Sequence, residues 1–207
     1  MTLVKICGIT NLEDALASVE FGADMIGLNF FEKSARYVSP TLAREIATES
    51  AKMVKRVGVF VNASIEHILE ICSNVGLDAI QLHGDETVEY EAVLRSRTDL
   101  ETIKAVRVGE HFDVHELVNF DSTILLDAYS DGEYGGTGEV FDWEVASQVW
   151  TIVPSMILAG GLNPDNVADA IRTVRPYAVD VASGVEASPG KKDPKKLEAF
   201  IRNAKNA

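Results

Sequence analysis

The sequence has few of the residues that metal sites and disulfides require. Its 207 residues include two cysteines, Cys7 and Cys72, which lie far apart and form no CxxC pair. This pattern predicts neither a zinc site nor a disulfide framework. Cys72 falls on the apolar face of an amphipathic segment, where a free cysteine usually serves as a small core hydrophobe. We therefore expect no metal and no cofactor.

Basic residues and long apolar runs are also scarce. Nineteen Lys and Arg face 32 Asp and Glu, which gives a net charge of −13. Such an excess of negative charge repels nucleic acid and anionic membranes. No apolar run approaches the roughly 18 residues of a membrane span, and the N-terminus shows no targeting pattern. We expect a cytoplasmic protein that binds a small molecule and neither nucleic acid nor membrane.

One unit recurs along the whole chain, an apolar run of strand length followed by a segment with helical spacing. The expected strands lie within 3–10, 24–30, 56–61, 78–83, 101–106, 122–127, 155–159 and 177–182. The expected helices lie at 11–22, from 39 onward, and near 64–75, 86–97, 111–119, 142–150, 163–174 and 194–204.

Strict alternation of this kind predicts parallel strands covered by helices. Eight repeats in so short a chain predict an α/β fold with a single (β/α)₈ TIM barrel, one catalytic domain over residues 1–207. The alternative is a doubly wound open sheet. It would need edge strands without inward polar groups, and we find none.

The active site of such a barrel lies at the C-terminal ends of its strands. Cys7, His83 and Asp127 end the first, fourth and sixth strands. Because side chains alternate along a strand, all three are expected to point into the barrel, as are Lys5 and Asp180. A cysteine at a strand end is more often inert packing, so the thiol alone does not decide the function.

Glycine-containing turns end the last two strands, at Gly160 and Gly161 and at Ser183 and Gly184. Barrels of this type often bind phosphate there through main-chain amides, and a Cβ would hold the phosphate away. Either pair alone more often marks a tight turn. Together they predict a phosphate site.

The segment 131–138 is rich in glycine and follows the Asp127 strand end directly. A long segment at the mouth of a barrel favours a lid that closes over ligand. The alternative is a flexible surface loop.

Cys7 and Asp127 lie on well-separated strands, so they can flank one ligand from two sides. A thiolate can remove a carbon-bound proton, and a carboxylic acid can protonate a leaving oxygen. These residues therefore predict cofactor-free proton transfer on a phosphorylated small molecule.

Seven ordered motifs cover essentially the whole chain: KICGIT, GLNFFEKSAR, QLHGDE, LLDA, GGTGEVFDW, LAGGLNPDNV and DVASGVE. With them the sequence resembles the phosphoribosylanthranilate isomerases of tryptophan biosynthesis. The resemblance implies an Amadori rearrangement of N-(5-phosphoribosyl)anthranilate to 1-(2-carboxyphenylamino)-1-deoxyribulose 5-phosphate, an aldose-ketose type isomerisation.

The resemblance also implies roles for individual residues. Asp127 is then the general acid at the furanose ring oxygen, and Cys7 is the general base at C2′. Arg36 holds the anthranilate carboxylate with its planar fork, the alternative being a solvated loop arginine. His83 lies beside the substrate, the alternative being a hydrogen-bonded histidine without a role.

Two other functions remain open. One is the related histidine-pathway isomerase, or an enzyme serving both pathways, in which an aspartate stands where this chain has Cys7. The other is a non-catalytic sugar-phosphate binding barrel, which would be marked by loss of Cys7 or Asp127. The sequence also leaves open whether the protein is a monomer or a homodimer.

Strand alternation leads to one hypothesis beyond the resemblance. Lys5 and Asp180 face the same interior from the first and last strands, so they are expected to pair, because an unpaired buried charge costs several kcal/mol. The pair is either structural only, or Lys5 also lowers the pKa of the Cys7 thiol. In the second case Asp180 holds Lys5 and contacts a ribose hydroxyl.

Overall fold

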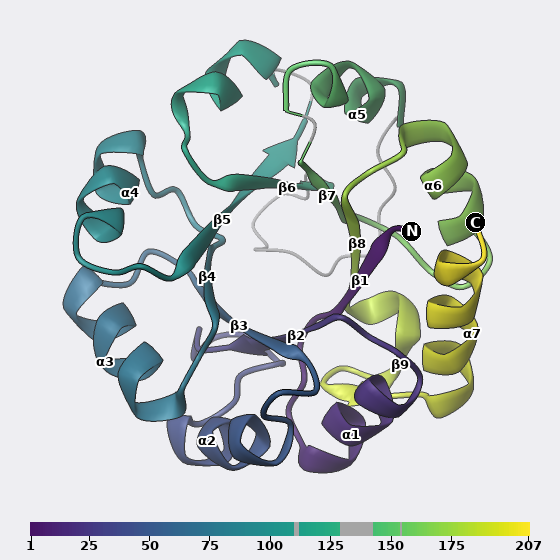
Figure 1. Ribbon diagram of the computed structural model, residues 1–207, viewed down its shortest axis with the longest axis horizontal. Helices are drawn as coiled ribbons and strands as arrows, with labels where there is room; N and C mark the ends of the chain where they lie inside the picture. The colour runs from purple at the N-terminus through teal and green to yellow at the C-terminus, as the bar shows by residue number, and fades with distance from the viewer. Residues whose placement is uncertain (110–111, 129–142, 154) are drawn as a thin grey trace.

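The computed structural model describes residues 1–109, 112–128, 143–153 and 155–207. Within this part, eight parallel strands form a closed barrel in chain order, and β8 pairs with β1 (Figure 1). The strands are β1 (Leu3–Ile6), β2 (Met25–Asn29), β3 (Lys55–Phe60), β4 (Ala79–Leu82), β5 (Glu101–Val108), β6 (Thr123–Ala128), β7 (Ile157–Leu158) and β8 (Ala178–Val181). The TIM barrel is confirmed, and the open sheet was wrong.

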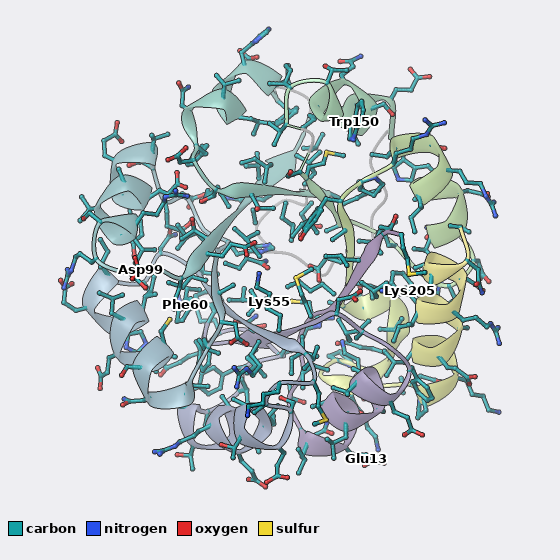
Figure 2. All side chains as sticks on the ribbon, in the orientation of Figure 1. Glu13, Lys55, Phe60, Asp99, Trp150 and Lys205 are labelled. Atoms are coloured by element: carbon teal, nitrogen blue, oxygen red, sulfur yellow. The ribbon has the colours of Figure 1, made fainter. Side chains whose placement is uncertain are left out.

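Helices surround this ring of strands (Figure 1). They are α1 (Leu12–Glu20), α2 (Pro40–Glu49), α3 (Ile65–Val75), α4 (Val88–Arg95), α5 (Trp143–Trp150), α6 (Val167–Val174) and α7 (Pro194–Lys205). Several begin at a side-chain cap: Asn11 accepts from the amide of Asp14 at 2.8 Å, and Asp193 caps α7 ahead of Pro194. Charged side chains such as Glu13 and Asp99 lie at the periphery (Figure 2).

The segment between β5 and β6 differs from the α-helix expected at 111–119. It forms a 3-10 helix, η1 (Val114–Asn119). Leu117 is buried there, but Val118 is 59% exposed and the neighbouring His115 and Asn119 are exposed as well. One buried anchor is too little for an apolar helical stripe, and short 3-10 turns are usual in such connections. The segment 131–138, expected to be a lid, lies outside the described residues.

Two apolar layers hold the barrel. The outer layer lies between strands and helices and includes Val4, Ile6, Ile80, Leu82, Ile124 and Leu126. The inner layer fills the barrel with Met25, Val57, Ala79, Ile103, Ala105, Leu125, Ile157, Ala159 and Ala178, with Leu3 packed against it. Alternate residues of each strand therefore face opposite layers, as predicted, and the inward positions beyond the inner layer carry polar groups.

A small hairpin follows β8 and was not expected. A three-residue 3-10 helix, η2 (Ser183–Val185), leads into the antiparallel strands β9 (Glu186–Ser188) and β10 (Lys191–Lys192). The amide of Lys192 donates to Asp14 Oδ2 at 2.8 Å, and the hydroxyl of Thr10 donates to the carbonyl of Gly190. The hairpin is thereby fixed against the connection from β1 to α1.

Within the described ranges, no helix is long and apolar enough to cross a membrane.

Candidate active site

One pocket lies at the C-terminal ends of the strands. Eight of the nine predicted site residues line it: Cys7, Arg36, His83, Asp127, Gly160, Gly161, Asp180 and Ser183. Gly184 does not line the pocket. The residues come from six different strands or the loops after them, so the closed barrel brings together groups that are distant in sequence.

Cys7 follows β1, and its amide donates to the Val181 carbonyl at 2.8 Å, which extends the β1–β8 ladder to the thiol. Gly27 on β2 makes room for its side chain. A Cβ at Gly27 would lie 2.7 Å from Cys7 Sγ and 3.2 Å from Lys5 Nζ. A thiol and an ammonium group therefore lie side by side against this glycine.

The predicted ion pair behind the thiol is present. Lys5 is fully buried and its Nζ donates to Asp180 Oδ1 at 2.9 Å. Burial opposes the charged form of Lys5, but Asp180 and Cys7 outweigh it and raise the pKa of Lys5. Burial also raises the pKa of the Cys7 thiol, while the charge of Lys5 opposes that rise and the charge of Asp180 adds to it. Lys5 thus acts on the thiol in the predicted direction but does not bring its pKa below the ordinary value.

Asp127 lies on β6 beside the imidazole of His83, which also contacts the side-chain amide of Gln81. The amide of Ala128 donates to Asp127 Oδ1 at 2.9 Å, and His83 Nε2 lies 3.4 Å from Asp127 Oδ2. On its other side, Gln81 Nε2 lies 2.7 Å from His83 Nδ1. With Gln81 as the donor, a neutral imidazole carries its proton on Nε2, facing the carboxylate.

The end of β6 and the loops after β7 and β8 meet closely at glycines. Gly160 and Gly161 have φ values of 76° and 65°, in the left-handed region that favours glycine. A Cβ at Gly160 would lie 2.5 Å from the Ala128 nitrogen, and one at Gly184 would lie 2.0 Å from the Leu162 oxygen. Gly184 therefore shapes the site by close packing.

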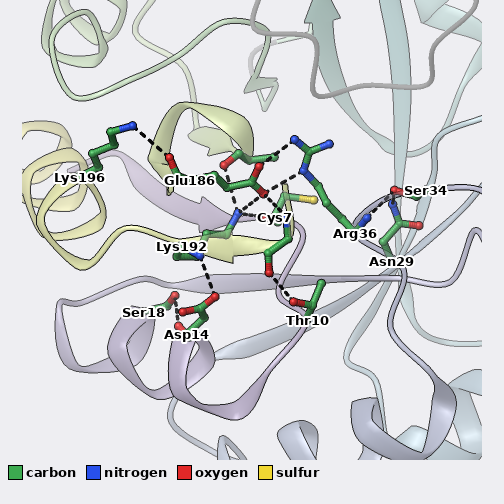
Figure 3. A network of polar contacts seen from close by, with 12 residues as sticks. Cys7, Thr10, Asp14, Ser18, Asn29, Ser34, Arg36, Glu186, Lys192 and Lys196 are labelled. Carbon is green, nitrogen blue, oxygen red and sulfur yellow. Dashed lines mark hydrogen bonds and ion pairs between the residues drawn. The ribbon is translucent and has the colours of Figure 1, made fainter. Parts of the chain in front are cut away.

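Arg36 lies at the edge of the pocket in an ion pair that the sequence did not predict. Its Nε and Nη2 donate to Glu186 Oε1 and Oε2 at 2.9 and 2.8 Å (Figure 3). The Arg36 side chain is only 17% exposed, so it is not a solvated loop arginine. Burial would raise the pKa of Glu186, but its hydrogen bond with Arg36 and the charge of Lys192 outweigh burial and lower it.

Lys192 and the pairing of Glu186 were missed in the sequence. Lys192 is one of two adjacent lysines in a polar stretch, which reads as a solvated surface. The turn dipeptide Pro189-Gly190 was the available signal for a hairpin. Among the described residues there is no cluster of three or more His, Cys, Asp or Glu side chains that could hold a metal ion.

The family model for N-(5'-phosphoribosyl)anthranilate (PRA) isomerase matches residues 4–203. The chain belongs to this family. The PRA isomerase of Thermotoga neapolitana is 52% identical over 206 residues, which cover 99% of both chains. The resemblance seen in the sequence motifs is thereby confirmed.

Two solved PRA isomerase structures match the whole chain at 48% identity. One, of monomers generated from the dimeric enzyme of Thermotoga maritima, has a TM-score of 0.89 and full coverage of both chains. The other is a complex with reduced 1-(o-carboxyphenylamino)-1-deoxyribulose 5-phosphate, with a TM-score of 0.90 and the same coverage.

Proposed function

We propose that Cys7 and Asp127 carry out the isomerisation of N-(5-phosphoribosyl)anthranilate as general base and general acid. The chain is an isomerase of tryptophan biosynthesis, an intramolecular oxidoreductase, by its family. The observation that carries the assignment of roles is that a thiol and a carboxyl group line one pocket from β1 and β6. These strands are well separated in the ring, so the two groups face a ligand from different sides.

The steps need only proton transfers. Asp127 protonates the furanose ring oxygen, the C1′–O bond breaks, and the ring opens to a Schiff base. The Cys7 thiolate then removes the proton from C2′, which gives an enolamine that tautomerises to the ketone. No electron leaves the substrate, so these steps require neither metal nor cofactor.

The two ends of the substrate are anionic and take different sites. We assign the phosphate to the main-chain amides of Gly160, Gly161, Ser183 and Gly184. Arg36 binds the anthranilate carboxylate, and Glu186 fixes the plane of its guanidinium. His83 lies beside the substrate next to Asp127, and Asp180 contacts a ribose hydroxyl while holding Lys5. These local groups overcome the negative net charge of the chain.

The assembly and location of the protein are inferred from a relative and from the substrate. The dimeric state of the T. maritima relative favours a homodimer over a monomer. A phosphorylated substrate does not cross membranes, which favours a cytoplasmic enzyme without membrane or nucleic-acid partners. We also expect residues 1–207 to act as one catalytic domain.

The activity is tested with freshly made phosphoribosylanthranilate. Purified protein is expected to remove the anthranilate-type fluorescence at a rate proportional to enzyme concentration. Heat-denatured protein is the control. A fluorescence decay no faster with native than with denatured protein would contradict the proposed function.

The anion sites are tested by inhibition. Inorganic phosphate is expected to compete with substrate, because it occupies the amides of the glycine turns. Arg36→Met is expected to raise KM without changing phosphate inhibition, because Arg36 binds the other end of the substrate. Arg36→Lys keeps the charge without the fork and is the matched control. Non-competitive inhibition by phosphate would place its site outside this pocket.

A further inference from the structure

Lys192 on β10 is a buried cation whose role the proposed mechanism leaves open. The residue is 2% exposed. Its Nζ donates to the carbonyl oxygen of Cys7 at 2.6 Å, to that of Ala182 at 3.1 Å and to Glu186 Oε1 at 3.2 Å (Figure 3). An ammonium group has three donors and no acceptor. These three acceptors match it in number.

The two carbonyls belong to the seam where the barrel closes. The paired register of β1 and β8 ends at Ile6 and Val181, and the Cys7 amide adds one more bond to Val181. The chain then turns at Gly8, whose φ is 73°. The carbonyls of Cys7 and Ala182 lie just past the last ladder bond, where partly buried acceptors need another donor. Lys192 supplies it from a separate element.

Glu186 connects Lys192 to Arg36, the side chain assigned to the substrate carboxylate. Its carboxylate binds Lys192 and, through two bonds, the guanidinium of Arg36. Arg36 in turn packs on the turn after the thiol, because a Cβ at Gly8 would lie 2.7 Å from Arg36 Cδ. The turn that carries Cys7 is therefore held by Lys192 at its carbonyl and by Arg36 at the next residue.

We propose that Lys192 is a positioning residue for the isomerisation. Its ammonium fixes the main chain of Cys7 and, through Glu186, the guanidinium of Arg36. The base and the carboxylate-binding side chain therefore keep a fixed position relative to each other. The inference rests on the proposed roles of Cys7 and Arg36. The alternative is that Lys192 only attaches the β9–β10 hairpin to the barrel and contributes to stability alone.

The thiol offers a readout that does not depend on substrate. The charged groups that act on it are Lys5 from β1, Asp180 from β8 and Lys192 from β10, and Arg36 and Asp127 line the same pocket. The charge of Lys192 favours the thiolate. Its removal is therefore expected to raise the pKa of Cys7, which alkylation by iodoacetamide measures as a shift of the pH midpoint.

The experiment compares Lys192→Met and Lys192→Gln with the control Lys196→Met. Lys196 on α7 is exposed and donates to the main-chain carbonyl of Glu186 at 3.0 Å, so the control removes an ammonium that contacts the same hairpin. The amide of Lys192→Gln can still donate to one carbonyl, which favours folding if the Met variant does not fold. For each protein, kcat, KM, the melting temperature and the alkylation rate of the Cys7 peptide against pH are measured.

Both Lys192 variants are expected to lose about 10²-fold in kcat, the scale of a displaced catalytic group, and to alkylate at higher pH than the parent. The control is expected to match the parent in both. A folded variant with a lower melting temperature but the parent's kcat and alkylation profile would overturn the proposal. Because alkylation needs no substrate, its profile tests Lys192 even if the isomerase assay fails.

Discussion

Asp127→Asn is expected to lower kcat by at least about 10²-fold, the usual contribution of a general acid or base. The amide cannot give a proton to the ring oxygen, yet it keeps the size of the side chain and can remain between the Ala128 amide and His83. KM is expected to change little, because the sites proposed for both anionic ends of the substrate lie elsewhere. Steady-state kinetics with the fluorescent substrate measure both constants.

Cys7→Ala is expected to lose at least as much, since it removes the proposed base at C2′. Cys72→Ala is its matched control. Cys72 is the other free thiol, and it is buried on α3 in the outer apolar layer. That control is expected to lose stability by forming a cavity while it retains kcat. Near-parent turnover in Cys7→Ala or Asp127→Asn would remove that residue from its assigned role.

The barrel was predictable because its signal is local and repeated. Each strand alternates between the two apolar layers, so short patterns such as Ile80, Gln81 and Leu82 predict which side chains point inward. The residues at the C-terminal ends of the strands then predict which groups line the active site. The same alternation placed Lys5 opposite Asp180 before any contact was known, because the first and last strands of a closed barrel are neighbours.

The contacts around Arg36 were not predictable in this way. Glu186 and Lys192 lie in a hairpin after the last barrel strand, and alternation along the barrel says nothing about where a hairpin folds back. A lysine in a polar stretch is normally solvated. Lys192 is buried because the seam between β1 and β8 presents two carbonyls to it, and that feature exists only after the barrel closes.

The segment between β5 and β6 shows the limit of apolar spacing as a signal. Val114, Leu117 and Val118 have helical spacing, but only Leu117 is buried. Helical spacing therefore predicted a helical turn at this position but not its type.

Lys5→Met is expected to destabilise the fold by about 3–5 kcal/mol, because it leaves Asp180 buried without its partner. It is also expected to shift the pH dependence of kcat/KM. In the proposed mechanism the thiolate is the active form of the base, so kcat/KM is expected to rise with pH through the pKa of Cys7. The charge of Lys5 holds that pKa down. Removal of Lys5 is therefore expected to move this rise in kcat/KM to higher pH.

Lys104→Met separates the loss of stability from the change in the thiol. Lys104 is also buried and ion-paired: its Nζ donates to Glu86 Oε2 and to the Gly84 carbonyl, both at 2.7 Å. Lys104→Met breaks a comparable buried ion pair, between β5 and the loop after β4. It is therefore expected to lower the free energy of unfolding by a similar amount. In this variant kcat/KM is expected to rise with pH over the same range as in the parent, because Lys104 lies in a different network from Cys7. If Lys5→Met behaved in the same way, with lower stability and an unshifted rise in kcat/KM, the Lys5–Asp180 pair would be structural and the tuning of Cys7 would be wrong.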